Sequence, residues 1–255
     1  MKKFTIRMCA LAVLACLSCN TAMASKYGGG EAYSEPTFRE LAQTMMFMDG
    51  FKTTEDVVVD EYAKLMYCGL YNEKFTNDFE WNKIRSMLLQ KIQTRKDYFR
   101  VLYQISGVIY LGRYNFETQD FPFINDSALV NVGSLVLFDA TNNAELQRQR
   151  VLCGGARAVS LIIPAYYVFR LNQPLTFDRL KIPMDEAQKL LNRMQKSKNL
   201  ERNLYVRFRV RVIAAHPASQ IQAALEAAVL SGELTAIDLF LDKEMTQPFA
   251  SVEVR

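Results

Sequence analysis

Histidine is almost absent from this sequence, since His216 is the only one in 255 residues. A Ser-His-Asp triad or a Cys-His pair would have to use that residue as its base, and no G-x-S-x-G nucleophile motif accompanies it. Zinc requires three or four converging His, Cys or acidic ligands, which a single histidine does not favour. The glycine triplet at 28–30 is not followed by Gly-Lys-Ser/Thr, so it is not a phosphate loop. We therefore expect no catalytic residue of these kinds, no metal and no cofactor.

Long apolar runs and an excess of charge are also missing. Beyond residue 24, no apolar run approaches the about 20 residues that a membrane-spanning helix needs. The chain has 31 basic and 27 acidic residues, and leaving out the three basic residues of positions 1–24 gives 28 against 27, a net charge of +1. Such a balance produces no long-range field for DNA, RNA or anionic lipid. We expect no nucleic-acid partner and no transmembrane span.

The start of the chain has the pattern of an export signal. Two lysines precede an apolar run from Met8 to Leu17, and residues 22–24 form an Ala-Met-Ala cleavage pattern. We expect residues 1–24 to be a cleaved signal peptide. The alternative is a lipoprotein, with cleavage before Cys16 and a lipid anchor on that cysteine. The domain is then periplasmic or secreted in the first case and membrane-anchored in the second.

Two cysteines remain beyond the expected signal peptide, Cys68 and Cys153. An even count in an oxidising compartment favours a disulfide, and we expect these two residues to pair. The alternatives are two free thiols or a nucleophilic Cys153 activated by His216. A disulfide would join positions 85 residues apart and would tie an early part of the chain to a late one.

Hydrophobic periodicity divides the chain into a helical part and a β-rich part. Residues 25–35 are expected to be a flexible lead-in because of their glycines. Residues 36–97 place apolar side chains at helical spacing, whereas residues 98–255 are dominated by strand-like alternation. We predict a single α+β domain over 36–255, in which an N-terminal helical segment precedes a mainly antiparallel sheet with one late helix.

Two helix starts are marked by capping boxes, in which a polar N-cap residue is followed three positions later by an acid. Thr37 with Glu40 marks the first, and Asn77 with Glu80 marks the last of three helices. A middle helix is expected to begin after Thr53 or Thr54. The buried face predicted for the last helix is Trp81, Ile84, Leu88 and Ile92.

The clearest strand is the segment NLYVRFRVRVIAA at 203–215, in which apolar and polar residues alternate with period two. The other expected elements are strands over 99–105, 108–116 after a break at Gly107, 130–138, 159–171 bent at Pro164, and 175–182 after a turn at 172–174; a helix over 183–194; a small helix over 218–230; and a C-terminal hairpin of 234–241 with 249–254.

Three arginines on that clearest strand, Arg207, Arg209 and Arg211, point to one side of the sheet. Guanidinium groups about 7 Å apart could bind a polyanion or an acidic partner. The alternative is that cross-strand acids neutralise them. The acids we consider for this are Asp238, Asp242 and Glu253.

Paired carboxylates offer one further catalytic possibility, because glycoside hydrolysis needs only two acids. Asp78 and Glu80 lie beside Trp81, and sugar-binding sites combine acids with aromatic platforms. Acids are also expected at the start of a helix for capping alone. An exposed Trp81 would favour the sugar site, and a buried one would favour the capping role.

Several short stretches resemble a family of exported bacterial proteins of about this length that is described as a domain of unknown function. They are Glu61-Tyr62, Tyr67-Cys68, Tyr71, Asn77 to Trp81 and Leu111 to Phe116. The resemblance implies no activity and brings no known catalytic residues.

These observations favour an exported envelope protein that acts as a non-catalytic binding or structural module, with an unknown envelope protein or polymer as its partner. The alternative is a carboxylate-pair hydrolase acting on an envelope polysaccharide.

Overall fold

The structure is a computed structural model that describes residues 32–48, 50–51, 56–94, 99–141, 143–150, 153, 163–197, 199, 201–222 and 225–253. The expected signal peptide and the first seven residues of the expected lead-in lie outside these ranges. The helices are α1 (Phe38–Phe47), α2 (Asp56–Met66), α3 (Cys68–Lys74), α4 (Asp78–Gln93), α5 (Ala144–Gln149) and α6 (Met184–Lys196). The strands are β1 (Leu102–Leu111), β2 (Asp120–Ile124), β3 (Leu129–Asp139), β4 (Tyr166–Phe177), β5 (Arg179–Lys181), β6 (Asn203–Gln222), β7 (Leu225–Phe240) and β8 (Pro248–Glu253).

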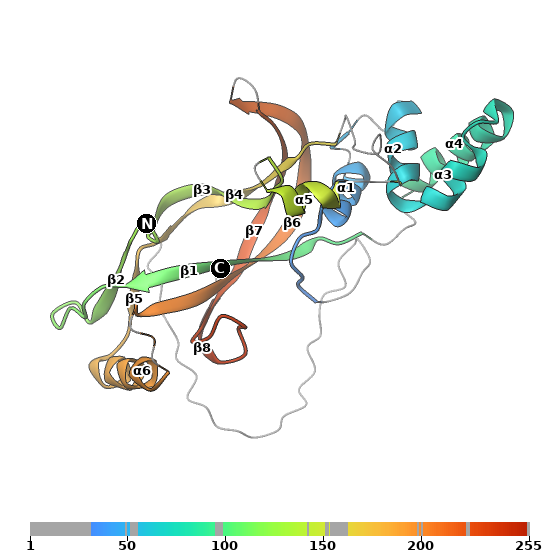
Figure 1. Cartoon of the computed structure of the whole chain (residues 1–255). Coiled ribbons are helices and arrows are strands. Elements are labelled where there is room, and N and C mark those ends of the chain that lie inside the picture. Colours follow the sequence, from blue (N-terminus) through green and yellow to red (C-terminus); the bar gives the residue numbers. More distant parts are fainter. Residues whose placement is uncertain are drawn as a thin grey trace, which may run out of the picture.

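The N-terminal helices begin where the capping patterns predicted. The Thr37 side chain accepts a hydrogen bond from the Glu40 backbone N–H, and the Asn77 side chain does the same for Glu80. The buried residues of α4 are the four that its period predicted. Helices α2, α3 and α4, which we call the helical arm, lie at one end of the molecule (Figure 1). Helix α1 joins this arm to the rest, because it contacts α2, α4, α5 and β6.

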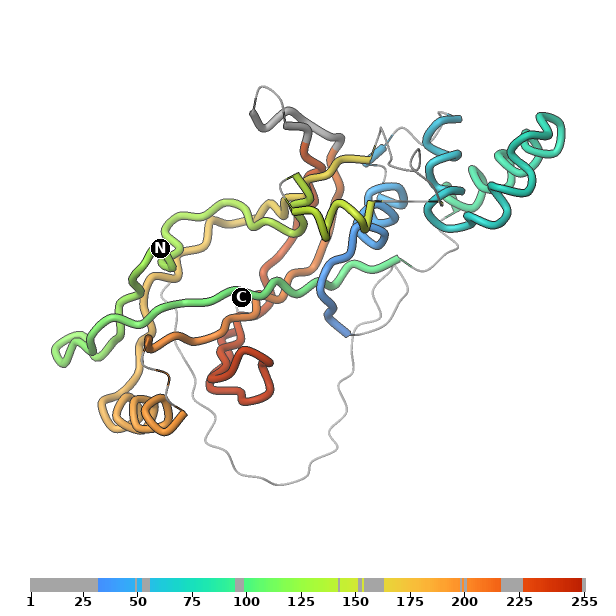
Figure 2. The backbone as a smooth tube through the Cα atoms, viewed as in Figure 1, coloured from blue at the N-terminus to red at the C-terminus, as the bar shows by residue number. Residues whose placement is uncertain are grey.

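The sheet is built around the long ribbon of β6 and β7 (Figure 2). Its strand order is β3-β4-β7-β6-β1-β2-β5, with β8 paired to the second half of β7. A single residue, Asp178, separates β4 from β5, although these strands lie near opposite ends of that order. The sheet must therefore curl, and the Phe123 backbone N–H donates to the Asp178 carbonyl at 2.8 Å where the ends meet.

The α+β class is confirmed, but two details of the predicted architecture are wrong. The sheet is mixed rather than antiparallel, since β4 and β7 run parallel over Tyr166–Leu171 and Ala227–Gly232. The helices are not confined to the N-terminal part with one late addition, because α5 and α6 both lie between strands. Helix α6, over Met184–Lys196, confirms the helix predicted at 183–194. Among the described residues, no helix combines the length and apolar character needed to cross a membrane.

Alternation on β6 was predicted correctly, and it supplies much of the core. The side chains at even positions 204 to 212 are all buried, whereas Arg211 on the opposite face is exposed. These buried residues join those of α1, α4 and β1 in one apolar cluster. Burying a large apolar side chain stabilises a fold by about 1.5–3 kcal/mol, so this strand is a principal source of stability.

Two predicted strand breaks are absent. Strand β1 continues through Gly107, which pairs with Val206; a Cβ at this glycine would lie 3.3 Å from the Val206 side chain, so the glycine allows a close approach. Strand β4 continues through Pro174, where the pairing with β3 shifts register between Val132 and Ser134. Proline is tolerated there because a bulge leaves its missing N–H without a ladder partner. The predicted strand start at 159 lies outside the described residues.

The small helix predicted over 218–230 is wrong. Its described part forms the ends of β6 and β7, which pair from Gln222 and Leu225 onwards. The four residues Ala227–Leu230 are all buried, as expected for a central strand flanked by β4 and β6. An uninterrupted apolar run of this kind cannot be told from a helix by its period. The C-terminal hairpin of β7 and β8 was predicted correctly.

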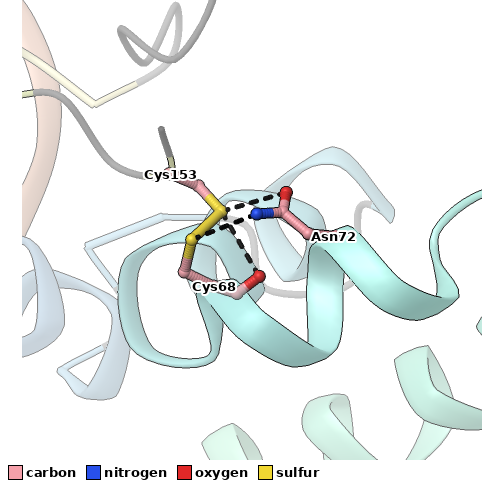
Figure 3. The surroundings of a disulfide bond; sticks show 3 residues. All are labelled: Cys68, Asn72 and Cys153. Carbon is pink, nitrogen blue, oxygen red and sulfur yellow. Dashed lines mark hydrogen bonds between the residues drawn. A yellow bond between two sulfur atoms is a disulfide. The ribbon is translucent and has the colours of Figure 1, made fainter. Parts of the chain in front are cut away.

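The predicted disulfide is present and links the helical arm to the segment that follows α5 (Figure 3). Cys68, the first residue of α3, has its Cα 5.3 Å from that of Cys153. The Asn72 side chain, one turn further along α3, lies against both sulfur atoms, with its Nδ2 3.6 Å from Cys68 Sγ and its Oδ1 3.4 Å from Cys153 Sγ. The bond therefore fixes α3 to a residue 85 positions later.

The double variant Cys68→Ser/Cys153→Ser should be less stable than the oxidised wild type by about 4 kcal/mol, because the unfolded chain regains the entropy of an open loop. Urea unfolding of both proteins measures this difference. The matched control is the wild type in reductant, which should unfold with the variant. An unchanged unfolding midpoint would show that the bond does not constrain the chain.

Candidate functional site

The three arginines of β6 lie on the face of the sheet opposite the core, and cross-strand acids neutralise two of them. Arg209 Nε donates to Asp238 Oδ2 at 2.6 Å, and Asp238 is only 4% exposed. The second carboxylate oxygen of Asp238 accepts from the Ser251 hydroxyl on β8. Arg211 forms an ion pair with Glu233 of β7. Arg209 and Arg211 are therefore neutralised by acids of the neighbouring strand, which was the alternative to a polyanion site.

Of the acids predicted to serve these arginines, Asp238 is a partner and Asp242 is not. Asp242 instead closes the turn after β7, where its carboxylate accepts from the Thr246 hydroxyl and from the backbone N–H groups of Thr246 and Gln247. The hydrogen bond from the Thr246 hydroxyl is the main reason that the pKa of Asp242 lies below its usual value. Glu233 was missed by sequence reasoning, because the register that sets it opposite Arg211 includes an irregularity.

Arg207 differs from the other two arginines. Its guanidinium lies over the Phe240 ring, 4.7 Å from the centroid, and this contact is a cation–π interaction. Asp238 is its register partner on β7, but that carboxylate is already taken by Arg209 and Ser251. Its buried Nε has no hydrogen-bond partner among the described residues. Only one arginine of the three thus retains a charge without an acidic partner in the described part of the chain.

A short N-terminal segment covers part of this face. Residues 32–35, which we call the strap, belong to the expected lead-in, yet they contact the sheet at several points. The Tyr33 ring lies over the Arg209 guanidinium, and its hydroxyl is 2.9 Å from Thr235 Oγ1. Ser34 forms a parallel bridge with Tyr103 of β1. Arg209 is therefore covered by the Tyr33 ring of the strap in addition to its ion pair with Asp238.

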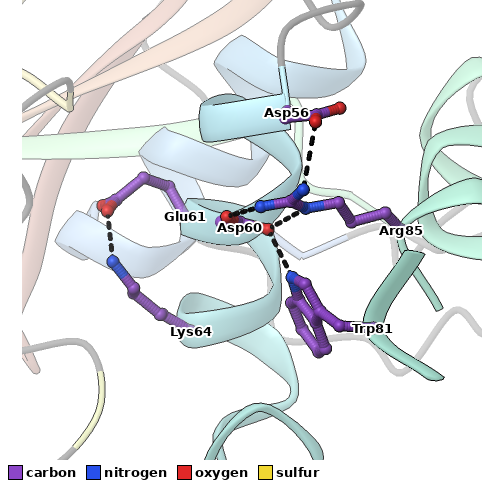
Figure 4. A network of polar contacts seen from close by, with 6 residues as sticks. All are labelled: Asp56, Asp60, Glu61, Lys64, Trp81 and Arg85. Atoms are coloured by element: carbon purple, nitrogen blue, oxygen red, sulfur yellow. Dashed lines mark hydrogen bonds and ion pairs between the residues drawn. The ribbon is translucent and has the colours of Figure 1, made fainter. Parts of the chain in front are cut away.

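The Asp78, Glu80 and Trp81 group does not form an exposed sugar platform. Trp81 is only 3% exposed, and its indole Nε1 donates to Asp60 at 2.9 Å (Figure 4). Asp78 and Glu80 are exposed in the first turn of α4, and the Glu80 carboxylate pairs with Lys74 at 3.3 Å. These acids lie on the solvent side of the helix whose buried side carries the tryptophan. They also lie in the helical arm, apart from the arginines of β6 (Figure 1).

Asp60 is the centre of a polar network in the helical arm that was not predicted from the sequence. Arg85 of α4 binds both of its oxygens, through Nε at 2.7 Å and Nη2 at 2.5 Å (Figure 4). The same guanidinium reaches Asp56 one turn earlier on α2 at 3.0 Å. Hydrogen bonds to Asp60 raise the pKa of Arg85. This network joins α2 to α4, and its partners are set by tertiary packing.

Cys153 and His216, the other pair considered for catalysis, are each engaged with a different partner. Cys153 is in the disulfide, so it offers no thiol to His216, whose Nε2 lies 2.7 Å from the Ser231 hydroxyl. Glu61 pairs with Lys64 at 2.9 Å on the other side of α2. Within the ranges that the structure describes, no three His, Cys, Asp or Glu side chains converge as metal ligands.

Asp60→Ala should lower the free energy of unfolding by about 2–4 kcal/mol, because it leaves the Trp81 N–H and the Arg85 guanidinium without their shared acceptor. Asp56→Ala removes an exposed carboxylate from the same arginine and should cost less than about 1 kcal/mol. Urea denaturation of the two variants gives the comparison. Equal losses would mean that Asp60 does not hold α2 and α4 together.

A family model described as a domain of unknown function, DUF4852, matches residues 54–193. The matched range includes the helical arm, the disulfide and strands β1 to β5, whereas the arginines of β6 lie beyond it. No curated protein and no solved structure matches the chain. Because the family model covers more than half of the 255 residues, the chain belongs to the DUF4852 family, a domain of unknown function.

Proposed function

We propose that this protein is an exported module of the bacterial envelope that binds another envelope component or supports its structure without catalysing a reaction. The observation that carries this proposal is the Cys68–Cys153 disulfide. Structural disulfides persist in oxidising compartments and are rare in the reducing cytosol. The expected signal peptide over residues 1–24 supports the same destination.

The polar groups of the candidate site favour a binding or structural role. Arg209 and Arg211 are engaged by Asp238 and Glu233, so little of the charge of this face is left to attract a polyanion. Asp60 is held by Arg85 and Trp81 inside the helical arm. These pairs stabilise the fold, and ion pairs of this kind need no substrate to complete them.

The hydrolase alternative is weakened by the position of Trp81. A glycosidase of this design needs two acids on either side of a bound sugar, with an aromatic surface open to stack on it. Here the indole is buried against Asp60, and Glu80 is paired with Lys74. Trp81 is buried, whereas Asp78 and Glu80 are exposed, so the three side chains do not share one surface. This supports the capping role for Asp78 and Glu80.

Purified protein incubated with isolated peptidoglycan sacculi and with envelope polysaccharide should release no new reducing ends or soluble fragments, because Asp78 and Glu80 lie beside a buried Trp81 and not beside an open sugar platform. The double variant Asp78→Asn/Glu80→Gln should behave like the wild type. Release of fragments by the wild type that disappears in this double variant would contradict the proposal and establish the hydrolase.

A further inference from the structure

The backbone of β1 offers one edge to β6 and the other to a different set of partners. The Val101 carbonyl accepts from Val212, and the Leu111 N–H donates to the Arg202 carbonyl. Because backbone direction alternates along a strand, the odd-numbered residues of β1 direct their N–H and C=O groups towards the β6 side. The even-numbered residues direct theirs to the outer edge.

The two ends of this outer edge are occupied. Near the start of β1, the Gln104 N–H donates to the Ser34 carbonyl of the strap at 2.9 Å. Near its end, the Tyr110 N–H donates to Ser127 Oγ at 3.1 Å, and β2 pairs only with Tyr110 and Leu111. Between these two contacts lie Ser106 and Val108. No strand or strap residue in the described part of the chain pairs with their outward backbone groups.

This open stretch, Ser106–Val108, contains no bulge, proline or charged residue, which are three of the devices that protect sheet edges. Native edges are blunted by bulges, prolines or charged side chains, and the pairing of β3 with β4 has three register shifts. By contrast, β1 pairs with β6 without a shift over all nine matched positions from Leu102 to Tyr110. Ser106 and Val108 are both exposed, and the latter is 39% exposed. A regular, accessible edge of this kind is a template for another strand.

We propose that the outer edge of β1 at Ser106–Val108 binds an extended peptide segment of a partner protein, which adds a strand between the strap and β2. This inference rests on the proposed binding role and names the class of partner. The unpaired N–H and C=O groups recur every two residues, about 6.6–6.8 Å apart, which is the repeat of a peptide backbone. The parallel bridge between Ser34 and Tyr103 shows that this edge already accepts an extended segment.

The surroundings of the edge indicate which side chains the peptide should carry. On the inner side, half-buried Ile105 packs against the core next to Gly107, so an apolar side chain is favoured there. On the outer side, the exposed Glu35 carboxylate accepts from the Ser106 hydroxyl at 2.5 Å. A hydroxyl or basic side chain suits this position, because an acidic one would meet the Glu35 charge.

The test uses the purified full domain and a display library of short random peptides as the probe. Selected peptides should bind the wild type and should bind Val108→Pro at least about tenfold more weakly, because proline removes the outward N–H. The matched control is Val108→Thr, which keeps that N–H and a β-branched side chain, and its affinity should stay within about twofold. Ser106→Pro removes the neighbouring N–H and should repeat the loss.

A second readout does not depend on how well the proline variants fold. Backbone N-methylation of a selected peptide at alternate residues should abolish binding to the wild type, and hydrogen exchange at Ser106 and Val108 should slow only with the unmodified peptide. A library that yields no binder, binders indifferent to Val108→Pro, or a dimer that the proline dissociates would overturn the proposal. Fragment release from sacculi would instead overturn the proposed non-catalytic role, so the two failures are distinct.

Discussion

The Cys68–Cys153 disulfide holds together parts of the fold that the sequence separates by 85 residues. One end lies in the helical arm and the other follows α5, so the bond adds a covalent link to the packing of α1 between arm and sheet. A bond across so long a loop restricts the unfolded chain strongly. Structural disulfides persist mainly in oxidising compartments, and this chemical requirement is what connects the architecture to the proposed export.

The arginines that stand out in this protein are mostly paired with acids of the same fold. Asp238 pairs with Arg209 and Glu233 pairs with Arg211, so two of the three arginines that suggested a polyanion site join β6 to β7. In the same way, Asp60 of α2 pairs with Arg85 of α4. Arg207 lies on an aromatic ring instead. The outer edge of β1 offers exposed backbone in addition to these side chains. Recognition of a peptide main chain requires no net charge and no cofactor, and it fits the nearly neutral composition beyond residue 24.

The features predicted correctly from the sequence are those that depend on residues close together in the chain. The caps at Thr37 and Asn77, the buried face of α4 and the alternation of β6 depend on neighbours a few residues away, and each is present. The short elements α3, α5 and β2 were missed because each has too few residues to show a period. The parallel pair of β4 and β7, the Arg211–Glu233 pair and the open edge of β1 depend on strand order and register. Strand order and register cannot be predicted from the local residue pattern of a single sequence.

The most direct test of the account is the intact mass of the protein purified from its native envelope, alkylated before and after reduction. We predict a chain that starts at Ser25, takes up no alkylating agent while folded and oxidised, and takes up two equivalents after reduction. A full-length chain recovered from the cytosol, with Cys68 and Cys153 both alkylated without reduction, would contradict export and the disulfide together.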